Sequence, residues 1–224
     1  MNAERAMTAW ASFSDLARRA LVLAGLLAAA GCTVLTGPSQ APVHYVLTDP
    51  RPVPKLSTQR QQALLVREMD VPAFYQDPRL VHSRAPGTRS HYEYARWSDP
   101  PGRRLSWLLR QRLEAAGGFA VVAPFAAGVT GEYQLNTRLI DLYHDSVSLP
   151  GTALVVIEAS LLRRETASQV GRRVFVGLAP VRRADADAAA DAMSEATNQV
   201  LDEIVLWIDA LFSRGSSGTA GGTR

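Results

Sequence analysis

The sequence is poor in several residue types, and each shortage narrows what the protein can be. Cys32 is the single cysteine, so no disulfide bond can form within the chain. Lys55 is the single lysine, and the 24 basic residues exceed the 21 acidic ones by only three. So small and scattered an excess of positive charge argues against nucleic-acid binding. The 224 residues are 47% hydrophobic, which is enough for one globular domain with a buried core.

Catalytic motifs are also missing. There is no G-x-S-x-G nucleophile elbow, no phosphate-binding glycine loop and no H-E-x-x-H zinc motif, and the histidines are not spaced as metal ligands. The strongest catalytic or metal-binding candidate is the group Asp141, His144 and Asp145, which we interpret as the solvated end of a strand. We therefore predict a protein that is not an enzyme and has no catalytic residue, no metal site and no cofactor.

A second acidic group comprises Asp185, Asp187 and Asp191. A cluster of carboxylates of this kind can bind a cation. It lies near the start of the last predicted helix, where the helix dipole favours negative charge. We interpret the group as helix-terminal charge rather than as a metal site.

The N-terminal segment has the features of a secretion signal. Arg18-Arg19 precedes an apolar run, 20–30, of about 11 residues, which is too short to cross a membrane. The sequence Leu27-Ala-Ala-Ala-Gly-Cys32 resembles a bacterial lipobox, in which small residues admit a signal peptidase and the cysteine thiol accepts a diacylglycerol. We predict a signal peptide over 1–31 and a membrane anchor formed by an N-acyl diacylglycerol on Cys32. The alternative is an ordinary signal peptide followed by a buried free cysteine.

Thr33 follows the cysteine, where an aspartate would indicate retention in the inner membrane. By analogy with enterobacterial sorting, we expect the chain on the outer membrane, facing the periplasm. Residues 32–42 are rich in Gly, Pro, Ser and Thr, and predict a flexible tether. The folded domain is predicted over 43–212, and the Gly/Ser/Thr-rich tail 213–224 is predicted to be disordered.

Alternating and β-branched residues predict the strands of a mixed sheet. The expected strands are 43–48, 63–71, 79–84, 91–96, 119–122, 133–139, 153–162 and 172–178. The turn residues Pro86-Gly87 indicate a hairpin between 79–84 and 91–96. The last three strands are expected to form an antiparallel meander.

Two helices complete the predicted domain. The first is expected to be capped by Asp99 and to end at Gly117-Gly118. Its apolar stripe consists of Leu105, Leu108, Leu109, Leu113 and Ala116. The second is a long C-terminal helix over 185–212. Two helices packed on a mixed sheet predict an α/β or α+β sandwich.

Trp107 is the candidate interface residue. It falls off the leucine stripe of the first helix and stands beside Arg103 and Arg110. An exposed tryptophan among arginines often marks a protein interface. Packing against a neighbouring loop is the alternative.

A series of short hydrophobic and polar sequence motifs, here called marks, follows the lipobox. These marks are Tyr45-Val46-Leu47, Leu65-Val66, Val71-Pro72, Gln76 to Val81, Arg84, Tyr92, Trp97, Tyr133 to Leu142, Ile204 and Trp207. Their order resembles the ABC-type transport auxiliary lipoproteins, the PqiC-like (YmbA-like) group, over roughly 45–211. No single mark is specific, and the family offers no catalytic residues to transfer.

The resemblance implies a fold like the N-terminal domain of TolB, and the role of an outer-membrane lipoprotein in a system that moves phospholipids or other hydrophobic molecules. The implied partners are an ABC permease, an ATPase and an MCE-domain protein that spans the periplasm. Self-association into a ring is a further expectation. Two other interpretations stay open: a structural assembly lipoprotein of another outer-membrane complex, and a periplasmic hydrolase or metal-binding protein centred on Asp141 and His144.

Overall fold

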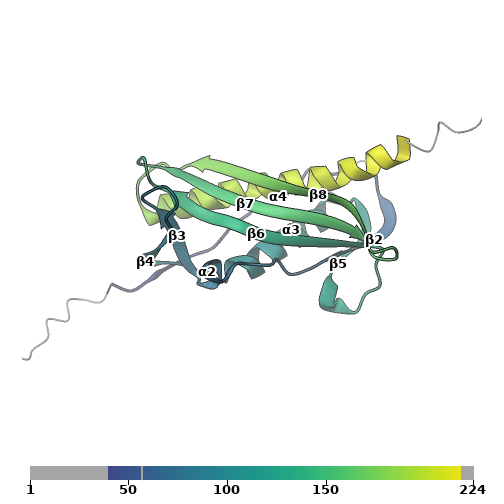
Figure 1. Cartoon of the computed structure of the whole chain (residues 1–224), viewed down its shortest axis with the longest axis horizontal. Helices are drawn as coiled ribbons and strands as arrows, with labels where there is room; N and C mark the ends of the chain where they lie inside the picture. The colour runs from purple at the N-terminus through teal and green to yellow at the C-terminus, as the bar shows by residue number, and fades with distance from the viewer. Residues whose placement is uncertain (1–39, 57, 218–224) are drawn as a thin grey trace, which may run out of the picture. The chain divides into compact units, whose positions relative to one another are not determined.

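The computed structural model describes residues 40–56 and 58–217, so the predicted signal peptide, the predicted lipidation site Cys32 and the tail beyond 217 lie outside the described residues. Within these ranges, eight strands form one mixed sheet accompanied by helices (Figure 1), which confirms the predicted fold class. The elements are β1 (Val43–Tyr45), β2 (Arg60–Val66), α2 (Ala73–Gln76), β3 (Arg79–Ser83), β4 (Ser90–Trp97), α3 (Pro101–Ala116), β5 (Phe119–Pro124), η1 (Phe125–Ala127), β6 (Tyr133–Asp145), β7 (Thr152–Arg163), β8 (Ser168–Pro180) and α4 (Ala186–Ser217). None of the helices in the described ranges is long and apolar enough to cross a membrane.

Strand β6 is the centre of the sheet. It forms an antiparallel ladder with β7 along its whole length, and β8 continues the meander beside β7. At its two ends β6 also pairs in parallel with β2 and with β3. The predicted meander is thus confirmed. Strand β8 begins at Ser168 rather than at 172, because the turn from Arg164 to Ala167 is tight and Ala167 adopts a left-handed φ of 51°.

The predicted strand 63–71 is divided in the structure. Strand β2 ends at Val66, and the next residues follow β6 only through separate hydrogen bonds, such as Asp70 N–H to the Thr137 carbonyl oxygen at 2.9 Å. Strand β2 also pairs in parallel with β5. The carboxyl ends of β2 and β5 therefore meet at one edge, beside α3. The predicted hairpin of β3 and β4 is confirmed.

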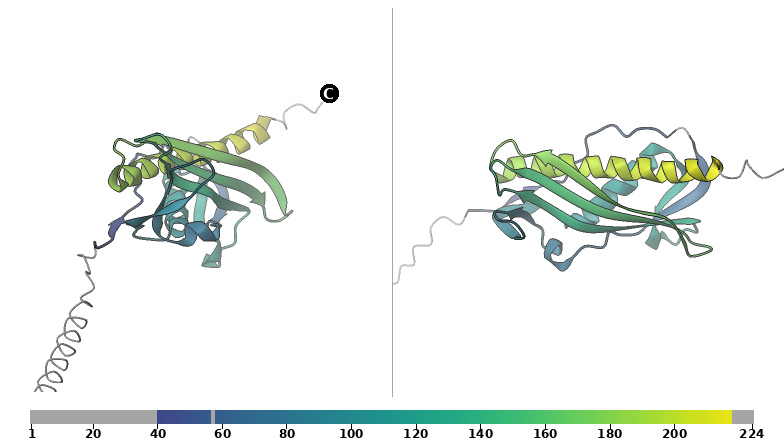
Figure 2. Two further views of the ribbon diagram at one scale, coloured as in Figure 1. Left: turned by 60° about the vertical axis from the view of Figure 1, so that its left-hand side comes forward. Right: turned by 45° about the horizontal axis from the view of Figure 1, so that its top comes forward.

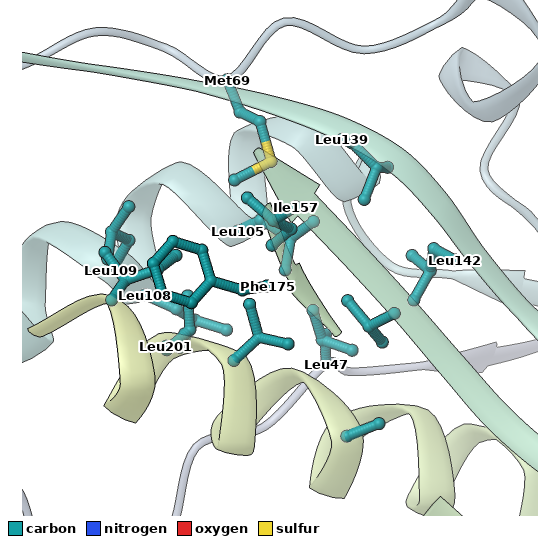
Figure 3. Packing of buried hydrophobic residues seen from close by; sticks show 14 of the residues in the cluster. Leu47, Met69, Leu105, Leu108, Leu109, Leu139, Leu142, Ile157, Phe175 and Leu201 are labelled. Atoms are coloured by element: carbon teal, nitrogen blue, oxygen red, sulfur yellow. The ribbon is translucent and has the colours of Figure 1, made fainter. Parts of the chain in front are cut away.

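Helices α3 and α4 contribute to one core with the sheet (Figures 2 and 3). The leucine stripe predicted for α3 is fully buried, and Leu108 and Leu109 join Phe175 of β8 and Leu201 of α4 in that core. Strand β8 also lies very close to α4, because a Cβ atom on Gly177 would be only 2.2 Å from the Ala196 carbonyl oxygen. The opposite face of β8 exposes aliphatic side chains.

Two predicted helix boundaries differ from the structure. Asp99 does not cap α3; Pro100 occupies the N-cap position, with its carbonyl oxygen accepting the Arg104 N–H at 3.2 Å. The left-handed Gly117 ends α3 as predicted. Helix α4 continues through Ser217 instead of ending at Phe212, so the tail expected from 213 is helical for its first residues. Once a helix is formed, each added residue gains a hydrogen bond, which offsets the weak helix propensity of Gly and Ser.

A buried arginine joins three parts of the chain that are distant in sequence. The Arg112 side chain on α3 is completely buried. Its Nε donates to Asp49 Oδ2 at 2.9 Å, and its terminal nitrogens form ion pairs with Asp49 and with Asp202 of α4. The segment between β1 and β2 is thereby attached to both long helices.

We expect Arg112→Met to lower the free energy of unfolding by about 3–5 kcal/mol, because two carboxylates lose their shared counter-charge at a buried position. Urea denaturation followed by circular dichroism measures this loss. The control is Arg110→Met on the same helix, whose partly exposed ion pair with Glu114 should contribute less than about 1 kcal/mol. Equal losses in the two variants would contradict the role assigned to Arg112.

Candidate functional site

Trp107 lies on the outer side of α3 and is 38% exposed. The guanidinium carbon of Arg104 is 4.5 Å from the centre of the indole ring, and Arg104 Nε donates to the Leu47 carbonyl oxygen at 2.9 Å. The cation that stacks on the ring is therefore itself held by the backbone. The arrangement fixes the indole while leaving part of it open to a partner.

The three predicted interface residues, Trp107, Arg103 and Arg110, line one hollow of about 200 Å³, together with the carboxyl ends of β2 and β5. A second hollow of about 430 Å³ adjoins it, since Glu68 and Arg103 line both. It extends past the first turn of α3 toward α2. We call the two hollows together the Trp107 groove. The carboxyl edge of parallel strands is a common place for binding sites in α/β folds.

The floor of the Trp107 groove is tightly built. The Ser106 hydroxyl accepts the Met69 N–H at 2.8 Å and donates to the Gly102 carbonyl oxygen at 2.6 Å. Gly102 itself has no room for a side chain, because a Cβ atom would be 2.3 Å from Val71 Cγ2. The segment after β2 and the first turn of α3 are thus held together as one surface.

Phe125 adds a second aromatic ring to this surface. It follows Pro124 at the end of β5 and is 38% exposed. The guanidinium carbon of Arg67, which lines the groove, is 5.2 Å from the centre of the Phe125 ring, and that of Arg164 is 5.6 Å away. Phe125 could not be predicted from the sequence, because nothing in its Gly- and Ala-rich loop indicates that the ring lies beside the Trp107 groove.

The groove carries charges of both signs, with Arg67, Arg103 and Arg110 against the carboxylates of Glu68 and Asp70. Arg110 is paired with Glu114 at 2.7 Å, whereas Arg67 and Arg103 form no ion pair within the described ranges. Two partly exposed aromatic rings among arginines are typical of protein interfaces. The arrangement suits a partner that offers carboxylates and apolar side chains together.

The structure does not bring together the other candidate group, Asp141, His144 and Asp145. A β-bulge after Leu139 sets the register, and Asp141 and His144 point to opposite faces of β6. His144 is buried, so our interpretation of it as solvated was wrong. Its Nδ1 is 2.7 Å from the Tyr92 hydroxyl and its Nε2 is 2.8 Å from the Pro150 carbonyl oxygen.

Asp141 has structural partners on the outer face of β6. It accepts the Tyr75 hydroxyl at 2.5 Å and pairs with Arg89 at 3.2 Å. Burial, together with the hydrogen bond to Asp141, raises the pKa of Tyr75 to about 12. The carboxylate thus holds α2 and the turn after β3 against the sheet.

The acidic residues at the start of α4 form hydrogen bonds with different partners. Asp185 Oδ1 accepts the Ala188 N–H at 2.8 Å, a hydrogen bond that, with Arg183, lowers the pKa of Asp185. Asp187 accepts the Tyr45 hydroxyl at 2.5 Å. Among the residues that the structure describes, no three acidic, histidine or cysteine side chains are placed to hold a metal ion.

The family model of the ABC-type transport auxiliary lipoprotein component matches residues 45–205. The chain belongs to this family. The auxiliary lipoprotein is similar to a Xanthomonas campestris protein of known crystal structure, with 25% sequence identity and a TM-score of 0.71. The match covers 78% of this chain and 99% of the Xanthomonas campestris chain. A second similar crystal structure is that of an uncharacterized protein, with 16% sequence identity and a TM-score of 0.60. The match covers 75% of this chain and 99% of the other chain. No curated protein matches the chain at a significant level.

Tyr75 of the auxiliary lipoprotein provides a test of the local geometry around Asp141. Because its pKa is raised from about 10 to about 12, the neutral phenol stabilises the fold fully below pH 10, and this contribution is lost as the pH rises toward 12. We expect Tyr75→Phe to lose less stability than the wild type between pH 8 and pH 11. Melting temperatures at the two pH values measure this, and identical losses would contradict the hydrogen bond.

Proposed function

We propose that this auxiliary lipoprotein is a non-catalytic docking subunit of an MCE-type ABC transport system for phospholipids or other hydrophobic molecules. In this proposal it is held on the outer membrane, facing the periplasm, by a diacylglycerol on Cys32. The family match over residues 45–205 is the observation that carries the proposal. The lipobox that ends at Cys32 supports the anchor, and Thr33 after it supports the outer membrane.

A docking role needs a rigid surface and a high local concentration of the domain near its partner. The structure of the groove supports the first, and the proposed lipid anchor supports the second. The lipid anchor confines the domain to a membrane, which raises its effective concentration for a partner arriving from the opposite side of the periplasm. The Trp107 groove supplies aromatic and basic side chains on a rigid floor. The MCE-domain protein is the proposed occupant of this groove.

Self-association of the chain stays a prediction. Strand β8 pairs only with β7 within the described ranges, so one of its edges is open. Its outer face exposes Val174, Val176 and Leu178, each by about half. An open edge with aliphatic side chains is a surface that subunits can share.

The anchor and the transport role are tested together by affinity purification from detergent-solubilised membranes. We expect the wild type to bring down an MCE-domain protein with its ABC permease and ATPase. Cys32→Ala removes the thiol that accepts the lipid, so the variant should be lost from the membrane fraction. Recovery of an outer-membrane assembly machine in place of the transporter would identify a structural assembly lipoprotein instead.

The docking surface is tested with Trp107→Ala. Truncating a tryptophan at the centre of an interface commonly costs about 2 kcal/mol or more, so the affinity for the MCE-domain protein should fall by roughly 30-fold. A titration of the purified proteins measures this. Leu206→Ala is the matched control, because Leu206 is 52% exposed on α4, away from the groove. Unchanged affinity in Trp107→Ala, or an equal fall in both variants, would place the interface elsewhere.

A further inference from the structure

Three turns meet at one end of the domain, which is the left end of the coloured ribbon in Figure 1. The turn between β6 and β7 is tied to the end of β3, because the N–H and hydroxyl of Ser146 both donate to the Ser83 carbonyl oxygen, at 2.8 and 2.7 Å. The same turn is tied to the segment before α4, since Val181 N–H donates to the Gly151 carbonyl oxygen at 3.0 Å. We call residues 84–89, 146–151 and 181–185 together the tip.

The tip exposes apolar side chains from a loop that is firmly held. Leu149 is 70% exposed and Val147 is 46% exposed. The loop that carries them is fixed by the contact of His144 with the Pro150 carbonyl oxygen and by the hydrogen bond from Val147 N–H to Asp145 Oδ1 at 3.2 Å. Leu149 is therefore exposed on an ordered loop, although contact with water is unfavourable for its aliphatic side chain.

The chain enters the domain from the side of the tip. Strand β4 begins at Ser90, beside the tip, and runs away from it. Strand β1 is parallel to β4, so Ala41 and Pro42 lead into Val43 from the tip's direction. The hydrogen bond from Tyr45 to Asp187 fixes this path beside the start of α4.

The length of the preceding segment limits how far the membrane can be. Ala41 follows Cys32 by nine residues, so a fully extended chain between them spans at most about 32 Å. Strand β6 has 13 residues and is about 40 Å long, so the ladder of β6 and β7 exceeds this reach. A chain anchored at Cys32 therefore brings the tip, rather than the opposite end of the ladder, toward the bilayer.

Two exposed arginines flank the apolar loop. Arg84 is on the turn after β3, and Arg182 precedes α4. Neither forms an ion pair within the described ranges, whereas their neighbours Arg89 and Arg183 are paired with Asp141 and Asp185. Guanidinium groups beside an apolar loop suit a surface of anionic phospholipids.

We propose that the tip is a membrane-contacting surface. Leu149 and Val147 enter the headgroup region of the bilayer that holds the anchor, and Arg84 and Arg182 bind the phosphates of anionic phospholipids. This inference rests on the proposed lipidation of Cys32. It adds a second contact that orients the domain, with Trp107 lying toward the end of β6 that is opposite the tip.

The test uses the full lipidated chain with Leu149→Cys. Because lipidation consumes the thiol of Cys32, the introduced cysteine alone takes up a thiol-reactive environment-sensitive fluorophore. The labelled chain is reconstituted into vesicles of phosphatidylglycerol and phosphatidylcholine, with and without spin-labelled lipid. Leu206→Cys is the control, because Leu206 is exposed on α4 near the middle of the helix.

We expect spin-labelled lipid to quench the fluorophore at position 149 and not at position 206. Adding Arg84→Gln and Arg182→Gln should bring the quenching at 149 down to the level of the control. Vesicle flotation without quenching at 149 would overturn the tip contact while leaving the anchor in place. A chain that neither floats with vesicles nor protects Cys32 from labelling would overturn the anchor, and the tip contact with it.

Discussion

A guanidinium group cannot be buried without counter-charge, and this constraint organises the domain around Arg112. Two carboxylates must reach its side chain, and they come from the segment after β1 and from α4. Arg51 lies 3.9 Å from Asp202 and donates to the Glu195 carbonyl oxygen at 3.0 Å, so the second carboxylate is shared between two cations. The resulting network of ion pairs fixes the position of α3 relative to α4.

The same network explains how a segment without helix or strand keeps a defined path. Residues 46–56 leave β1 and lead to the start of β2. Their far end is fixed by Lys55 Nζ, which donates to the Ala115 carbonyl oxygen at 2.6 Å, and by Leu56 N–H, which donates to that of Ala116 at 2.9 Å. Together with Asp49 and Arg51, these contacts attach the segment to α3 and α4 along its length. The chain is thereby carried from the tip to the opposite end of the sheet.

Much of this fold could be predicted from periodicity, because the meander and the two helices each bury one face. Trp107 could be found in the same way, since it breaks the apolar stripe of α3. The pairing of β2 between β5 and β6 could not, because parallel strands are joined by long connections that leave no local signal. The bulge after Leu139 was equally hidden; it sets which residues of β6 face inward, and so separates Asp141 from His144. Burial of His144 depends on the Tyr92 hydroxyl and the turn at Pro150, which only the folded chain brings together.

The Trp107 groove and the tip are both held in shape by a serine hydroxyl that bonds to the backbone of another segment. The Ser106 hydroxyl joins α3 to the segment after β2 by accepting the Met69 N–H, and the Ser146 hydroxyl holds the turn that carries Leu149 by donating to the Ser83 carbonyl oxygen. A surface ordered before binding loses less conformational entropy when a partner arrives, so more of the contact energy appears as affinity. The Trp107 part of the groove lies beside Val66, which pairs with Leu135 near the start of β6, whereas Leu149 follows the end of that strand.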